Sequence, residues 1–203
     1  MAEPIDIWER ARRTWAVGAA ELERLESSVD RGAFERLVCL LGDGKGRIAV
    51  AGAGTSGAAA HKIAHSLCCV ERPAFFLSPA DAVHGGLGAV QPGDVAILIS
   101  KGGGTREILS LVPSLRAKQV SIVGVTENAD SALARASDLL LQVRIEREAD
   151  EFNMLATTST MAVVAVFDAV CIALMAYTRY TREQFAVIHP AGAVGDRLLG
   201  GKE

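Results

Sequence analysis

The stretch RIAVAGAGTSG, residues 47–57, decides the fold, because it joins a strand pattern directly to a glycine-rich turn. Residues 47–51 are apolar after the arginine, as in a buried strand. The glycines allow a tight turn, and a helical pattern then runs to residue 70. A buried strand, a glycine turn and a helix together predict a parallel sheet that is covered by helices.

The same alternation continues towards the C-terminus. Short runs rich in Val, Ile and Leu predict further strands at residues 74–77, 95–99, 120–125 and 138–143. Helical patterns lie at residues 106–117, 154–177 and, briefly, 181–185. We therefore predict one α/β domain over residues 1–203, a three-layer α/β/α sandwich with a five-stranded parallel sheet of the flavodoxin-like kind.

Two helices are predicted ahead of this alternation, over residues 5–28 and 33–41. In the first of them Trp8, Trp15 and Leu22 recur at heptad spacing. Such a stripe packs either on the core of the same chain or on a partner subunit, and the pattern leaves both interpretations open.

The charge balance argues against two classes of partner. The 203 residues carry a net charge of −3, so we expect neither nucleic acid nor an anionic membrane as a partner. Asp168 interrupts the apolar segment 154–177, which we interpret as a helix buried between layers or in a subunit interface. The acidic start lacks the pattern of a signal peptide, and we expect a cytoplasmic protein.

A second glycine-rich turn, SKGGGT at residues 100–105, follows the strand at 95–99. Ligands of open parallel sheets bind at the carboxyl ends of the strands, where turns that open helices offer free N–H groups to a phosphate. The candidate phosphate- and substrate-binding residues of the two turns are Gly54, Thr55, Ser56, Ser100, Lys101, Gly102 and Thr105. Ordinary turns with Ser and Thr as helix caps are the alternative interpretation.

Two other kinds of site receive weaker support. Residues 52–57 match the G-x-G-x-x-G pattern of dinucleotide-binding folds, but Ser78 and Pro79 stand where such a site needs an acidic residue. A nucleotide-binding oxidoreductase is therefore a minority hypothesis. His61 and His65 have the spacing of a metal pair, but no third ligand is evident and we expect no metal.

These motifs together resemble the sugar isomerase (SIS) domain family, and more closely its arabinose-5-phosphate isomerase type. The turns at 52–57 and 100–105 are similar to the family's phosphate-binding turns. The segments HGGLG (84–88), REA (147–149) and HPAGAVG (189–195) are similar to its HGDLG, KEA and HPGGALG motifs. Longer members carry two CBS modules beyond this region, and we expect none here.

The resemblance implies an aldose–ketose isomerase of a phosphorylated sugar, of the arabinose 5-phosphate/ribulose 5-phosphate type, that needs no cofactor. It implies that Glu148 and His189 are the acid–base residues and that His84 is a further catalytic histidine. It also implies homodimers or homotetramers with active sites shared between subunits.

Isomerisation moves a proton between adjacent carbons through an enediol, which requires a base beside the C–H bond. Glu148 is the candidate base, and we expect the acidic run around it to raise its pKa; a solvated charge run is the alternative. Thr157, Thr158 and Ser159 are expected to cap the helix that follows and to contact the ligand in part.

The chain departs from the family pattern in both turns. Thr55 stands where the family has lysine, and SKGGG at 100–104 stands where it has Ser-Asn-Ser-Gly-Glu. Lys101 is a candidate replacement for the lost positive charge, and a solvated lysine is the alternative. The departures leave two further hypotheses open: a sugar-phosphate-binding protein without catalysis, and an isomerase of another C4–C6 sugar phosphate.

Overall fold

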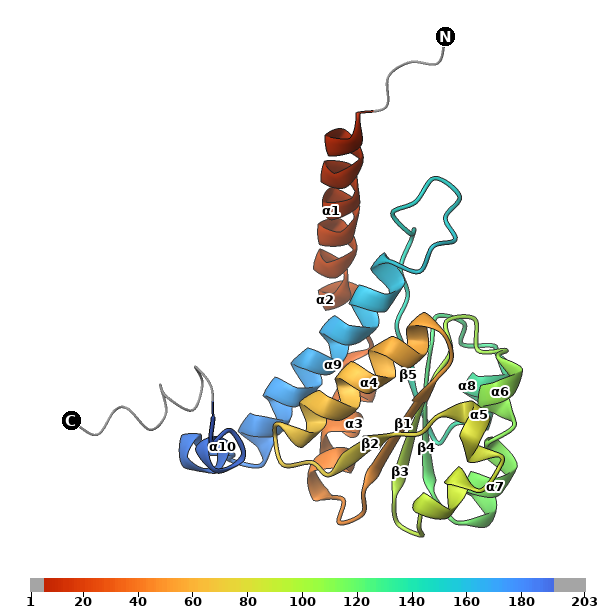
Figure 1. The fold of residues 1–203 in the computed structure, drawn as a ribbon, viewed down its shortest axis with the longest axis vertical. Helices are drawn as coiled ribbons and strands as arrows, with labels where there is room; N and C mark the ends of the chain where they lie inside the picture. Colours follow the sequence, from red (N-terminus) through yellow and green to blue (C-terminus); the bar gives the residue numbers. More distant parts are fainter. Residues whose placement is uncertain (1–5, 192–203) are drawn as a thin grey trace, which may run out of the picture.

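Five parallel strands form one sheet in the computed structural model, which describes residues 6–191 (Figure 1). The strands lie in the order β2-β1-β3-β4-β5. Their bounds are β1 (Ile48–Gly52), β2 (Ala74–Phe76), β3 (Val95–Ile99), β4 (Ser121–Thr126) and β5 (Leu139–Gln142). This is the strand order of flavodoxin-like folds, so the predicted fold class is confirmed.

Helices cover both faces of the sheet, and three of them, α1 to α3, come before β1 along the chain (Figure 1). Their bounds are α1 (Ile7–Glu23), α2 (Leu25–Ser28), α3 (Arg31–Asp43), α4 (Thr55–Cys68), α5 (Pro79–Ala82), the 3₁₀ helix η1 (Gly86–Ala89), α6 (Arg106–Leu109), α7 (Val112–Ala117), α8 (Ala132–Ala136), α9 (Thr158–Tyr177) and α10 (Arg182–Ile188). The sequence predicts one helix over 106–117, but Pro113, which lacks an N–H group, lies in the first turn of a separate helix α7.

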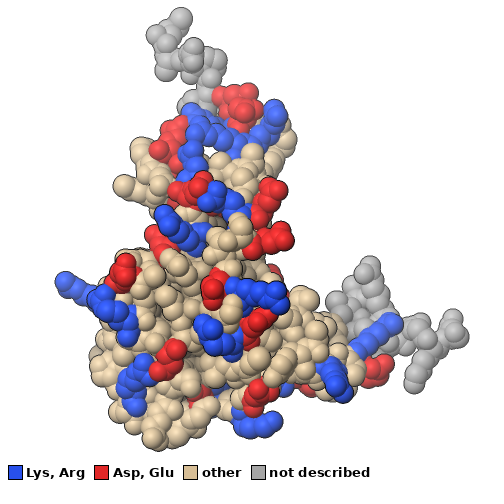
Figure 2. All heavy atoms as spheres, turned by 180° about the vertical axis from the view of Figure 1, so that it is seen from behind, with Lys and Arg blue, Asp and Glu red and all other residues tan. Residues whose placement is uncertain are grey.

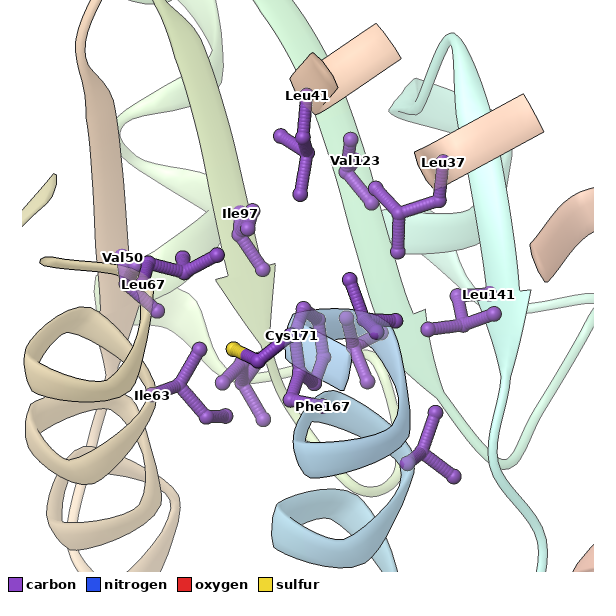
Figure 3. Packing of buried hydrophobic residues seen from close by; sticks show 14 of the residues in the cluster. Leu37, Leu41, Val50, Ile63, Leu67, Ile97, Val123, Leu141, Phe167 and Cys171 are labelled. Carbon is purple, nitrogen blue, oxygen red and sulfur yellow. The ribbon is translucent and has the colours of Figure 1, made fainter. Parts of the chain in front are cut away.

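The strands alternate their side chains between two apolar cores. Val50 and Ile97 pack against α3, α4 and α9, whose contributions include Phe167 (Figure 3). Ala51 and Leu98, the next residues along the same strands, pack against α5 to α8 on the other face. The period of two in a strand thus places one hydrophobic set in each core.

Helix α9 is long and apolar enough to span a membrane by length and composition alone. Here it packs against α1, α3 and α4, and Phe167, Val170 and Leu174 are fully buried in the core. A core helix that faces several layers has this composition, as the sequence predicts.

Helix α1 stands away from the sheet and packs against α9 (Figure 1). Gly18 faces α9, where a Cβ would lie 2.6 Å from the terminal methyl of Met161, the flexible end of that side chain. Trp8 and Trp15 form an edge-to-face pair with ring centroids 5.4 Å apart, and both are more than half exposed. These two tryptophans therefore do not pack into the core of the chain, and their packing on a partner subunit stays a prediction.

Charged side chains of both signs are interspersed over the face that Figure 2 displays. They do not form a continuous basic area on that face. A local arrangement of donors is therefore needed to hold an anionic ligand.

Candidate functional site

The two glycine-rich turns lie side by side at the carboxyl edge of the sheet. Strands β1 and β3 are hydrogen-bonded neighbours, and their last residues, Gly52 and Ile99, are partners in the register. The turns at 53–54 and 100–105 begin directly after these residues. The two turns are therefore neighbours at one edge of the sheet.

The first turn depends on close backbone contacts that glycine alone permits. A Cβ on Gly52 would lie 2.4 Å from the carbonyl oxygen of Ser56, and Gly54 has a φ of +58°. Helix α4 then begins at Thr55, and Ser56 is partly exposed at its N-terminus. Free N–H groups and the positive end of the helix dipole therefore point towards this edge.

The second turn is closed by its own hydroxyl groups. Ser100 is buried, its Oγ lies 2.7 Å from Thr105 Oγ1, and it accepts a hydrogen bond from the N–H of Gly103. Gly102 is exposed, and a Cβ there would meet no atom within 4 Å. Ser100 and Thr105 therefore stabilise the turn, and Gly102 leaves open space beside it.

Glu148 is fully buried and lies at the N-terminus of α9. One carboxylate oxygen accepts hydrogen bonds from Lys101 Nζ at 2.8 Å and from the hydroxyl of Ser159. The other accepts from the backbone N–H groups of Thr157 and Ser159 at 3.0 and 3.1 Å, and from the hydroxyls of Thr157 and Thr158. The carboxylate is thus an anion bound at a helix N-terminus.

These donors set the ionisation of Glu148. Burial alone raises the pKa of the carboxyl group, but hydrogen bonds from Lys101, Ser159 and Thr157 outweigh it and lower the pKa from 4.5 to about 2. The expectation that neighbouring acids raise this pKa is therefore wrong. The alternative of a solvated charge run is also wrong for Glu148, which has no exposed surface.

The residue that caps the N-terminus of α9 differs from the prediction. Thr157 occupies the N-cap position, but its side chain makes no capping hydrogen bond to the helix. Instead the side chains of Thr157, Thr158 and Ser159 donate to Glu148, and Glu148 accepts from two N–H groups of the first turn. The distant glutamate is therefore the cap of this helix.

Two hollows meet at Lys101. A small hollow of about 40 Å³ is bordered by Thr55 and Ser56 of the first turn, by Lys101, and by Ser159. A polar hollow of about 490 Å³ lies over the ends of β4 and β5, and its border includes Lys101 and Arg144. The candidate binding residues Thr55, Ser56, Lys101 and Ser159 are therefore brought together.

The two candidate histidines lie apart from this cluster. His189 follows α10, where its ring stacks on Phe185 with centroids 4.0 Å apart. Helix α9, roughly 30 Å long at 1.5 Å per residue, separates it from Glu148 (Figure 1). His84 is exposed after α5 and borders neither hollow. Residues 192–195 of the predicted HPAGAVG motif lie outside the described residues.

The two histidines with metal-pair spacing have other partners. His61 stacks on Phe76 with ring centroids 3.6 Å apart, and His65 lies 3.6 Å from the sulfur of Cys69. Within residues 6–191 no group of three metal-ligating side chains occurs.

Sequence reasoning missed two acidic residues near the site. Glu127, directly after β4, borders both hollows, and its place after a strand at the carboxyl edge was a usable signal. Glu21 of α1 is buried and accepts hydrogen bonds from the N–H groups of Glu146 and Arg147, directly before Glu148. Its contact spans 125 residues, and no local pattern indicates it.

Comparison with known proteins places this geometry in a family. The family profile of the SIS domain matches residues 42–173. Arabinose 5-phosphate isomerase KpsF of Escherichia coli O6:H1 is 39% identical over 93% of this chain and 58% of its own length. Arabinose 5-phosphate isomerase KdsD of Pseudomonas aeruginosa is 35% identical over 98% of this chain and 61% of its own length. The chain thus spans about three fifths of the length of these curated relatives.

Solved structures agree with this assignment. A protein of Listeria monocytogenes superposes with a TM-score of 0.91 at 49% identity, over 93% of this chain and 100% of its own. A protein of E. coli CFT073, solved in complex with arabinose 5-phosphate, superposes with a TM-score of 0.88 at 32% identity, over 94% of this chain and 100% of its own. The chain therefore belongs to the SIS domain family.

Proposed function

We propose that the protein is an aldose–ketose isomerase of a phosphorylated sugar, with arabinose 5-phosphate and ribulose 5-phosphate as its substrate pair. One observation carries the proposal: Lys101 joins the hollow between the two glycine turns to the carboxylate of Glu148. A phosphate group and a base for the reacting carbon can then be held at one edge of the sheet. The relatives named arabinose 5-phosphate isomerase support this choice of substrate.

The phosphate is bound by the first turn and by Lys101. Thr55 and Ser56 present hydroxyl and N–H donors at the N-terminus of α4, where an anion is stabilised. Lys101 supplies the cation within reach of the same hollow. Binding energy at the phosphate orients the sugar and is available for the reaction at the distant carbons.

The chemical step is a proton transfer between neighbouring carbons of the open-chain sugar. The Glu148 carboxylate takes the proton from C2 of the aldose, which leaves an enediolate with its negative charge on O1. Glu148 then delivers a proton to C1, while an acid–base partner protonates O1 and removes the proton of O2, which gives the ketose. The two sugars are isomers, and the proton held by Glu148 can exchange with solvent before it is returned.

The acid that serves the sugar oxygens is His189 of a second copy of the chain. Within one chain, α9 separates His189 from Glu148, so both reach one site only across a subunit interface. Exposed apolar residues support assembly, in particular Trp8 and Trp15 on α1 and Phe152 in the loop before α9. We therefore propose a homodimer or homotetramer with shared sites.

A binding protein without catalysis is the second candidate. It is favoured by Thr55 and Gly104, which replace the lysine and glutamate of the family pattern, and by the low pKa of Glu148, which makes it a weak base in the ligand-free structure. An isomerase of another C4–C6 sugar phosphate is a variant of the first candidate.

A panel assay tests the proposal. The protein is incubated with C4–C6 aldose phosphates, and ketose formation is followed for the wild type, Glu148→Gln and His189→Ala. We expect turnover of arabinose 5-phosphate that falls by at least about 100-fold in each variant, the usual loss when a general acid or base is removed. Turnover that survives both substitutions would refute the assigned roles.

A further inference from the structure

The contact between Lys101 and Glu148 poses a problem for the proposed base. Glu148 has no exposed surface, and Lys101 and Ser159, which donate to one of its oxygens, border the hollow in its place. An ionised carboxylate has about four lone-pair positions, and five donors already address them besides the hydroxyl of Thr158, which it shares with the carbonyl of Arg147. In this state Glu148 can neither reach a substrate carbon nor readily accept a proton.

Among these donors, only Lys101 can move without unfolding the site. The other donors belong to the first turn of α9, where Thr158 is 1% exposed. The side chain of Lys101 is 40% exposed and ends in a flexible four-carbon stem. Its backbone is fixed, since its carbonyl accepts from the N–H of Glu127 and from the hydroxyl of Thr126. The ammonium group can therefore pivot while the turn stays in place.

A phosphate group in the small hollow would be a stronger partner for Lys101 than Glu148 is. Lys101 borders the hollow that is lined by Thr55 and Ser56, and the space beside Gly102 is open. A phosphate monoester there carries nearly two negative charges at neutral pH, against one on Glu148, so its attraction to the cation is the stronger.

We propose that Lys101 is a latch on Glu148 that the substrate opens: the phosphate of a bound sugar draws the ammonium group away and thereby uncovers the carboxylate. This inference rests on the proposed function for the identity of the substrate. Lys101 keeps its protons throughout, so the step exchanges one ion pair for another. The base is active only when the substrate's phosphate is in place.

No other charged group around Glu148 in the described residues acts as its cationic partner. Arg147, in the same loop, directs its Nε to the backbone carbonyl of Glu148. The other nearby charged residues are acidic: Glu146, Asp150, Glu127 and Glu21 of α1. The Nε of Arg24 lies 3.8 Å from a carboxylate oxygen of Glu21. The first turn of α9 carries neither an acidic nor a basic side chain. Among residues 6–191, Lys101 is the cation that pairs with Glu148.

The latch predicts a rise in the pKa of Glu148 when the ligand binds. Lys101 is the largest of the influences that lower this pKa, so its withdrawal raises it. The test is a ¹³C NMR titration of protein labelled at glutamate side chains, with the Glu148 signal assigned from Glu148→Gln. Free wild-type protein should show no titration of Glu148 above pH 4. Saturating arabinose 5-phosphate, or inorganic phosphate as the probe, should move the titration upward by one pH unit or more.

Lys101→Met should produce the same upward shift without ligand, and added phosphate should then cause no further shift. Exposed Lys45, at the opposite edge of the sheet, is the matched control: Lys45→Met should behave as the wild type in both titrations. A Glu148 titration that moves neither with phosphate nor with Lys101→Met would overturn the latch.

The kinetics give a second readout. The acid limb of kcat/KM reports the free enzyme, and that of kcat reports the enzyme–substrate complex. We expect the acid limb of kcat to lie at higher pH than that of kcat/KM in the wild type, and this gap to close in Lys101→Met. Coincident limbs in the wild type would contradict the latch while leaving the isomerase intact. A phosphate-induced NMR shift without turnover would keep the latch and refute the isomerase.

Discussion

Glu148 is stabilised as an anion by groups that lie far from it along the chain. Lys101 comes from a turn 47 residues earlier, and the first turn of α9 supplies its N–H and hydroxyl donors about ten residues later. Such charge-assisted hydrogen bonds favour the ionised form by more than burial disfavours it. The folded state therefore binds a proton at this group more weakly than the unfolded chain does.

This difference predicts an acid-dependent loss of stability. Because the folded pKa of about 2 lies below the ordinary 4.5, the stabilisation is complete above pH 4.5 and is lost as the pH falls towards 2. By pH 3 the loss should be about 2 kcal/mol, at about 1.4 kcal/mol for each pH unit between the two values. Urea unfolding at pH 6 and pH 3 measures it.

Glu148→Gln is the reference for this measurement, because it retains the other acids and removes only this titration. The free energy of unfolding of the variant should fall less between the two pH values than that of the wild type. An equal fall in both proteins would mean that Glu148 is not held as an anion.

At the scale of elements, the first turn depends on the contact between the end of β1 and the start of α4. A Cβ on Gly52 would lie 2.4 Å from the carbonyl oxygen of Ser56, a backbone atom that cannot move without shifting the helix. Gly104, in the second turn, has no atom within 4 Å of the same position. An added methyl group therefore clashes with the backbone at position 52 and fits into open space at position 104.

We expect Gly52→Ala to destabilise the fold and to weaken phosphate binding, whereas Gly104→Ala changes neither appreciably. The loss for Gly52→Ala should be about 1–3 kcal/mol, as for other forced overpacking. Thermal unfolding with and without inorganic phosphate measures both effects. Equal behaviour of the two variants would contradict the close approach of β1 and α4.

Helix α1 supports the loop that carries Glu148. The carboxylate of Glu21 accepts hydrogen bonds from the N–H groups of Glu146 and Arg147. Arg10 forms an ion pair with Glu151, further along the same loop. We predict that Glu21→Gln costs about 1–3 kcal/mol, because an amide cannot accept both N–H groups as a carboxylate does. Hydrogen exchange at residues 146–148 should also accelerate. Glu23→Gln, at an exposed position two residues later, is the control and should leave the exchange unchanged.

The sequence allowed the elements to be predicted better than the contacts between them. The strand at 95–99 was placed at its observed bounds, because a run of apolar residues between turn signals is a local property. The burial of Glu148 was not predictable, since residues 146–151 read as a solvated acidic run. Its environment depends on Lys101 and Glu21, which are distant in the sequence. The short helices α5 and α8 also escaped prediction, being a single turn each.

At the scale of the whole molecule, one chain does not hold all the proposed acid–base residues together. Glu148 lies at the start of α9, and His189 follows α10 beyond its other end (Figure 1). The exposed Trp8 and Trp15 on α1 show that apolar surface is available for a partner. We therefore propose that a second copy brings its own His189 to this chain's Glu148.

Mixed assemblies test this arrangement. Glu148→Gln and His189→Ala are each expected to be inactive alone. Coexpressed with different affinity tags and purified as hybrids, they should regain activity, because one shared site then combines the intact residues of both chains. Hybrids as inactive as their parents would show that each site is built within one chain.

The measurement that tests the central claim most directly is proton exchange at C2 of arabinose 5-phosphate in deuterated water, followed by NMR. If the two turns and Lys101 present the sugar to Glu148, deuterium should enter C1 of the ribulose 5-phosphate that forms and, through the reverse reaction, C2 of arabinose 5-phosphate. Glu148→Gln should abolish this exchange while the sugar phosphate still stabilises the protein against heat. Binding of arabinose 5-phosphate to the wild type without any deuterium at C2 would contradict the account and leave a protein that only binds the sugar phosphate.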